Sequence, residues 1–128
     1  MAIKPADQAL VESYYAAMRM GAAGAGPLTE LFSDDAVYIE PFSGGDGRTR
    51  THVGKRIIGE FFKNAVNQRP RDMVVTMNRI DAEGERLRAE WTCTSSLFAG
   101  PMRGVDLYTL RDGKIARLET SLLNNRAD

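Results

Sequence analysis

The chain has 128 residues, 43% of them hydrophobic and 27% charged, and its 17 basic and 17 acidic side chains cancel to a formal net charge of zero. A chain of this length buries roughly two thirds of the surface that it exposes when unfolded, so we expect one domain over residues 1–128 and exclude two full domains. The balanced charge argues against nucleic acid or an anionic membrane as a partner.

Several other classes are also disfavoured by the sequence. No apolar run approaches the roughly 20 residues that a membrane span needs, and the first residues carry no secretory apolar stretch, so we expect a cytoplasmic protein. Cys93 and His52 are the only cysteine and histidine, which is too few for a Cys/His zinc site. Because no glycine-rich phosphate loop is present either, we expect neither a metal nor another cofactor.

The first half of the chain has the patterns of helices. Apolar residues recur at helical spacing over residues 5–20, and the alanines and glycines of residues 21–26 end that helix. Residues 27–32 predict a short second helix, and residues 36–40 predict a short strand. The spacing over residues 54–67 then predicts a third helix.

From residue 71 onward the sequence has the period of strands, and a short hairpin precedes the third helix. Residues 43–47 have the composition of a hairpin connection, and residues 48–51 predict a short returning strand. Three helices followed by an antiparallel meander predict an α+β fold in which the helices cover one sheet face. The meander consists of four expected strands, over residues 73–80, 86–98, 102–110 and 114–123.

Alternation along these strands separates two faces of the sheet. From Leu87 to Cys93 every second residue is apolar, so this set is expected to face the core. The strand over residues 102–110 is apolar at both parities, which is typical of a strand covered on both sides. Since the helices cover only one face, we expect a homodimer that packs through the outer face of the sheet.

Asp106 lies in the middle of that strand, where aspartate is disfavoured and costly to bury without a partner. Burial would raise the pKa of this carboxyl and make it a general acid or a neutral hydrogen-bond donor near neutral pH. The alternative is a structural aspartate that binds a backbone amide or an arginine.

Two further residues carry candidate chemistry, and the one histidine does not. Glu40 ends the strand over residues 36–40 beside a flexible loop, where it is a candidate general base or, alternatively, a solvent-facing edge charge. Tyr14 lies on the apolar face of the first helix, a position more typical of a core tyrosine. His52 has no acidic partner nearby in the sequence, so we expect it to be exposed.

Four segments together resemble a known family. They are residues 10–14 on the first helix, residues 32–42 around Glu40, residues 54–62, and the run Val105-Asp106-Leu107. With them, the chain resembles the ketosteroid isomerase branch of the NTF2-like superfamily. This resemblance implies an NTF2-like cone, also called cystatin-like, in which three N-terminal helices pack on a curved antiparallel sheet around a ligand pocket.

The resemblance implies a cofactor-independent isomerase that moves a double bond by abstracting a proton α to a carbonyl. Glu40 would be the base, and Tyr14 and a protonated Asp106 would donate hydrogen bonds to the oxyanion. The implied ligand is a hydrophobic carbonyl compound. Eight residues are expected to bind it as apolar walls: Met18, Phe62, Leu87, Ala89, Trp91, Tyr108, Leu118 and Leu122.

Other functions in the same superfamily stay open at this point. Glu40 stands where the isomerases carry an aspartate, and the segment over residues 41–54 is longer than usual, so the substrate is not defined. The alternatives are a SnoaL-type polyketide cyclase and a non-enzymatic module that binds a small molecule. A limonene-type epoxide hydrolase needs an arginine between two aspartates, and the strand arginines Arg88, Arg103 and Arg117 lie on the outward parity.

Overall fold

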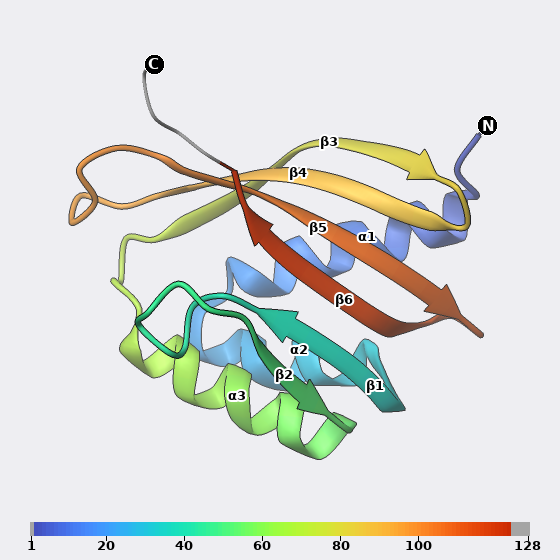
Figure 1. Cartoon of the computed structure of the whole chain (residues 1–128), viewed down its shortest axis with the longest axis horizontal. Coiled ribbons are helices and arrows are strands. Elements are labelled where there is room, and N and C mark those ends of the chain that lie inside the picture. The colour runs from blue at the N-terminus through green and yellow to red at the C-terminus, as the bar shows by residue number, and fades with distance from the viewer. Residues whose placement is uncertain (1, 124–128) are drawn as a thin grey trace.

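The computed structural model describes residues 2–123, which form helices and one curved sheet (Figure 1). The helices are α1 (Pro5–Met18), the 3-10 turn η1 (Gly21–Gly24), α2 (Ala25–Glu30) and α3 (Lys55–Gln68). The strands are β1 (Phe32–Glu40), β2 (Arg50–Val53), β3 (Val74–Glu83), β4 (Arg86–Thr94), β5 (Met102–Arg111) and β6 (Lys114–Leu122). The α+β class predicted from the sequence is confirmed.

The sheet has the strand order β2-β1-β6-β5-β4-β3. Strands β3 to β6 form the expected antiparallel meander, and β1 and β2 form an antiparallel hairpin. The expectation of a wholly antiparallel sheet was wrong at one place, because β1 pairs in parallel with β6. The meander returns the last strand beside the first, so residues of β1, β5 and β6 become neighbours in one sheet (Figure 1).

Several element boundaries differ from the expected ones. The second helix ends at Glu30 and β1 already begins at Phe32, so the first strand is longer than predicted. Strand β4 ends at Thr94 instead of continuing to Phe98. It ends there because Asp72 accepts a hydrogen bond from the Ser96 amide at 2.9 Å, which removes that amide from strand pairing.

The core lies between the helices and the inner face of the sheet. The expected inward set on β4 is confirmed, since Leu87, Ala89, Trp91 and Cys93 are all buried. The same expectation was wrong for Leu122, whose side chain is 46% exposed. Leu122 is the last residue of β6, and it pairs with Gly104, which offers no side chain to cover it.

The outer face of the sheet carries charged side chains in ion pairs, including Arg86 with Glu119 and Arg88 with Glu90. The homodimer expected through this face stays a prediction. Within residues 2–123, no helix has the length and apolarity needed to cross a membrane.

Candidate functional site

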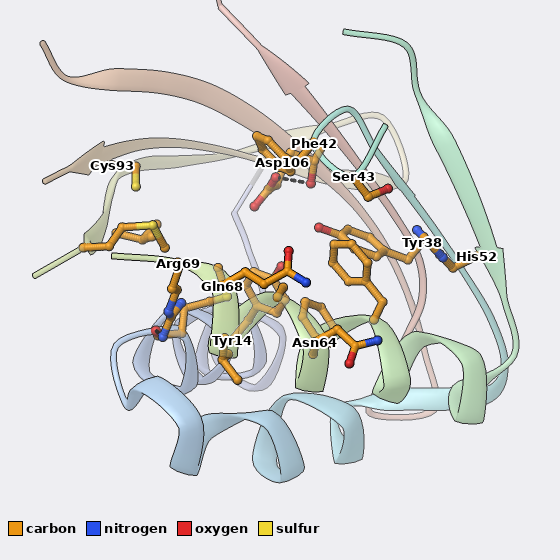
Figure 2. Close-up of a pocket in the computed structure, with 18 of the residues that line it drawn as sticks. Tyr14, Tyr38, Phe42, Ser43, His52, Asn64, Gln68, Arg69, Cys93 and Asp106 are labelled. Carbon is orange, nitrogen blue, oxygen red and sulfur yellow. Dashed lines mark hydrogen bonds between the residues drawn. The ribbon is translucent and has the colours of Figure 1, made fainter. Parts of the chain in front are cut away.

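A cavity of about 640 Å³ lies between the helices and the inner face of the sheet (Figure 2). Its volume is in the range of cavities that hold small molecules. Apolar and aromatic side chains form most of the wall, including Tyr38, Phe61 and Trp91, and a few polar groups interrupt it. Such a wall suits a mostly apolar ligand with a small number of polar contacts.

Asp106 on β5 lies in the wall of this cavity, 3% exposed. Its Oδ1 accepts hydrogen bonds from Thr120 Oγ1 at 2.7 Å and from Trp91 Nε1 at 3.1 Å. Its Oδ2 accepts hydrogen bonds from Tyr15 Oη at 2.5 Å and from Tyr108 Oη at 3.3 Å. The Asp106 carboxyl, which was predicted to be buried, is thus surrounded by side-chain donors from α1, β4, β5 and β6.

The sheet register places these donors. Trp91 pairs with Gly104 across β4 and β5, and a Cβ on Gly104 would lie 2.1 Å from Trp91 Cζ2, so only glycine lets the indole lie across β5. Thr120 pairs directly with Asp106 across β5 and β6. Burial raises the pKa of Asp106, although the hydrogen bonds from Tyr15, Thr120 and Trp91 work in the opposite direction.

Tyr14 and Tyr15 are adjacent on α1, and both side chains are buried and line the cavity. The hydrogen bond to Asp106 comes from Tyr15 and not from Tyr14, which was the tyrosine expected beside that carboxyl. Tyr14 packs edge-on against the rings of Tyr15 and Tyr108, with ring centroids 5.3 and 5.8 Å apart. Burial, Tyr38 and Asp106 raise the pKa of Tyr14, so its hydroxyl keeps its proton.

Glu40 is completely buried, yet it lies behind the cavity wall and is absent from the lining residues. Its Oε1 accepts hydrogen bonds from the amides of Phe42 at 2.6 Å and Ser43 at 2.9 Å. Its Oε2 contacts Ser43 Oγ at 2.6 Å and His52 Nε2 at 2.8 Å. Burial alone would raise the pKa of Glu40, but hydrogen bonds from His52, Ser43 and Phe42 bring it below its ordinary value.

The structure contradicts the expectation that His52 is exposed and without an acidic partner. His52 lines the cavity, its side chain is 19% exposed, and it pairs with Glu40. In the hairpin His52 pairs with Tyr38, which makes Glu40 its diagonal neighbour two residues along β1. The sequence predicted the two short strands of this hairpin, but it did not define their register. Only the register shows that His52 lies beside Glu40.

Only part of the predicted apolar wall faces the cavity. Met18, Phe62 and Trp91 line it. The remaining expected wall residues lie outside the lining: Leu87, Ala89, Tyr108 and Leu118 are buried in the surrounding core, and Leu122 is exposed.

Other lining residues come from helix ends and loops that strand alternation could not reach. Phe42 and Ser43 belong to the loop after β1, and Asn64 and Gln68 belong to α3. Arg69, which caps α3, also lines the cavity. In residues 2–123 no group of three or more His, Cys, Asp or Glu side chains is placed to hold a metal ion.

Comparison with known proteins shows the family. Residues 11–118 match the SnoaL-like domain family. Because this match spans most of the chain, the protein belongs to the SnoaL-like family. The resemblance to SnoaL-like proteins is thereby confirmed, and solved structures described as NTF2-like share the fold.

Solved structures show the same fold at low sequence identity. A Sinorhizobium meliloti protein provisionally assigned as a polyketide cyclase is 21% identical, with a TM-score of 0.70 over 88% of this chain and 94% of that chain. A Kribbella flavida protein provisionally assigned as a ketosteroid isomerase is 17% identical, with a TM-score of 0.66 over 94% and 79%. TerC, crystallised with polyporic acid, is 20% identical, with a TM-score of 0.73 over 92% of both chains. A search of curated proteins finds no significant match.

Proposed function

We propose that the cavity binds a hydrophobic carbonyl compound and that the chain catalyses proton transfer at the carbon next to that carbonyl, without a cofactor. The observation that carries this proposal is a pair of buried carboxyls in different surroundings. Asp106 lies in the cavity wall and is held by side-chain donors, and Glu40 lies just behind it and is held by backbone amides, Ser43 and His52. The pKa of Asp106, in the cavity wall, is raised, and the pKa of Glu40, just behind the wall, is lowered. Such a separation is typical of sites where one group donates hydrogen bonds and another takes protons.

The base is the point at which the proposal departs from the sequence analysis. Glu40 lies behind the wall and cannot itself meet a ligand, so we propose that it acts through His52, which lines the cavity. When Glu40 accepts a hydrogen bond from Nε2–H, the neutral ring keeps an electron pair on Nδ1. His52 would then take the proton from the ligand, and Glu40 would stabilise the resulting cation.

Tyr14 and Asp106 remain the proposed donors to the oxyanion that forms when the proton leaves. Among the four partners of Asp106, only Trp91 is restricted to donating, whereas Tyr15, Tyr108 and Thr120 carry hydroxyls that also accept. A protonated Asp106 is therefore compatible with every contact that surrounds it. Its raised pKa supports this state.

The proposed reaction balances without an external reagent. The C–H bond next to the carbonyl breaks, the proton moves to His52, and the electron pair becomes an enolate. In an isomerase of the ketosteroid type the proton returns at the γ carbon and the double bond shifts. In a cyclase the enolate carbon attacks a second carbonyl of the same ligand, and the proton goes to the new alkoxide. The provisional cyclase and isomerase assignments of structural relatives support both versions.

A spectrophotometric assay with a β,γ-unsaturated 3-ketosteroid tests the isomerase version, using the native protein, Glu40→Gln, His52→Gln and Tyr14→Phe. We expect conjugation by the native protein, a large loss with His52→Gln and a smaller loss with Tyr14→Phe. Absence of turnover in the native protein would rule out steroid isomerisation. Full activity of His52→Gln would rule out the proposed base.

A non-enzymatic binding module is the second candidate, and one observation favours it. Both oxygens of Asp106 already accept two hydrogen bonds each inside the protein, which is how a purely structural carboxylate is held. This candidate predicts that apolar carbonyl compounds bind and that no variant changes the rate of proton exchange in a bound ketone.

A further inference from the structure

Arg69 lies at the end of the cavity opposite His52, beside Cys93 (Figure 2). It follows the last turn of α3, and its side chain is half-buried. Its Nη2 donates a hydrogen bond to the carbonyl oxygen of Met18, the last residue of α1, at 2.6 Å. A guanidinium has five N–H donors, so this single contact leaves most of its hydrogen-bonding capacity unused.

The charge of Arg69 has no counterpart in the part of the chain that the structure describes. None of the ion pairs within residues 2–123 includes Arg69. Of the acidic side chains in the cavity wall, Glu60 pairs with Arg56 at 2.9 Å, and Asp106 is surrounded by its own donors. One end of an otherwise apolar cavity therefore carries an unbalanced positive charge.

The end of α1 accounts for the contact with Met18, because a cation is favoured beside the last carbonyls of a helix, but it uses only one of the donors of Arg69. A neutral donor would satisfy a single carbonyl, and partial burial of a charge costs free energy. That cost is visible in Arg69, whose pKa is lowered by burial. An arginine at the wall of a ligand cavity is well suited to a planar carboxylate, which it binds through two parallel hydrogen bonds.

We propose that the ligand of this cavity is an acid, an apolar carbonyl compound whose carboxylate binds Arg69 at one end while its reacting carbonyl lies between Asp106 and His52. This inference rests on the proposed function and specifies its substrate class. Arg69 is then a residue that selects and orients the substrate and takes no part in moving the proton.

The test compares two probes of nearly the same size and shape, the anion 1-naphthaleneacetate and the neutral 1-naphthaleneacetamide, in which an NH₂ donor replaces one carboxylate oxygen. Their Kd values are measured by isothermal titration calorimetry with the native protein, Arg69→Met, Arg69→Lys and Arg71→Met. Arg71 is an exposed arginine two residues away and serves as the matched control. The ratio of the two Kd values is taken within each variant, so a partly unfolded fraction affects both probes alike.

We expect the native protein and Arg71→Met to bind the acid at least about tenfold more tightly than the amide. Arg69→Met should remove this preference, and Arg69→Lys should retain part of it, because an ammonium keeps the charge but not the planar pair of donors. Equal binding of both probes by the native protein, an unchanged preference in Arg69→Met, or no binding of either probe would overturn the proposal. The calorimetric Kd values involve no turnover, so none of these results would decide the proton-transfer proposal, which the steroid assay tests separately.

Discussion

Asp106 and Glu40 are both buried carboxyls with four hydrogen bonds each, yet their environments differ. Asp106 lies on the central part of β5 and is held only by side chains, three of them hydroxyls that can reverse their direction. Glu40 lies at the end of β1, where its Oε1 accepts the fixed amides of Phe42 and Ser43. Backbone amides can only donate, so they favour the ionised form.

Burial therefore does not by itself determine the state of a carboxyl in this protein. Hydrogen bonds from His52, from the Ser43 hydroxyl and from the amides of the loop after Glu40 lower the pKa of Glu40 against the cost of burial. Asp106 lacks such fixed donors apart from Trp91, and burial dominates. The difference predicts one neutral and one charged carboxyl on the two sides of a single cavity wall.

The largest expected effect is on catalysis. His52→Gln removes the proposed base and should reduce the rate of proton transfer by about 100-fold or more, the usual contribution of such a group. Glu40→Gln should reduce the rate less, because the imidazole remains in place. Steady-state rates of all variants on one ketone check this order. If Glu40→Gln lost more rate than His52→Gln at an equal folded fraction, Glu40 would contact the ligand directly.

Removal of the Asp106 carboxyl should give the largest loss of stability. Asp106→Ala leaves several buried donors without an acceptor and should lower the free energy of unfolding by about 2–4 kcal/mol. Asp106→Asn keeps an acceptor for Trp91 and is neutral, so it should cost only about 1 kcal/mol. Urea unfolding at neutral pH measures both, and equal losses would indicate that the native carboxyl is ionised.

The matching change at Glu40 should behave differently. Glu40→Gln removes a charge that backbone amides stabilise, and should cost about 1.5–3 kcal/mol at neutral pH, more than the neutral replacement at Asp106. The same unfolding measurement applies. A smaller loss of unfolding free energy in Glu40→Gln than in Asp106→Asn would contradict the assignment of the charged state to Glu40 and the neutral state to Asp106.

The pH dependence of these losses has opposite signs. Because the pKa of Glu40 is lowered on folding, its contribution is present above its ordinary value and is lost as the pH falls through the lowered pKa. Because the pKa of Asp106 is raised, its contribution is present below its ordinary value and is lost as the pH rises through the raised pKa. The deficit of Glu40→Gln should therefore shrink in acid, and that of Asp106→Asn should shrink toward neutral pH.

The smallest expected effect separates the two tyrosines of α1. Tyr15→Phe removes the 2.5 Å hydrogen bond to Asp106 and should cost about 1 kcal/mol of stability. Tyr14→Phe should cost less stability and affect the rate of turnover more. Thermal and urea unfolding of both variants measures the stability losses, and turnover of the same ketone measures the rates. A larger stability loss in Tyr14→Phe together with a larger rate loss in Tyr15→Phe would contradict these roles.

The sequence predicted those features that depend on local periodicity. Alternation along β4 placed Trp91 on the core face, and the isolated carboxyl in an apolar strand marked Asp106 as buried. Helical spacing predicted the three helices in their order, and resemblance to a family then added the cone. These features depend on neighbours in the chain, so a single sequence carries them.

The remaining features depend on register and on element ends. Tyr14 and Tyr15 are adjacent on one apolar helix face, and only packing decides which hydroxyl meets Asp106. The pairing of His52 with Glu40 depends on how the hairpin aligns. Arg69 lines the cavity from the position just after α3, and helical spacing does not indicate where a side chain beyond the last turn points.

The central claim is that His52 removes a proton from the carbon next to a carbonyl of a ligand bound in this cavity. The most direct test is NMR detection of deuterium exchange from D₂O into a bound aliphatic ketone, since isomerases and cyclases share that step. The account predicts protein-dependent exchange that His52→Gln abolishes and Arg71→Met leaves unchanged. Exchange that is no faster than in buffer, or that persists in His52→Gln, would contradict it.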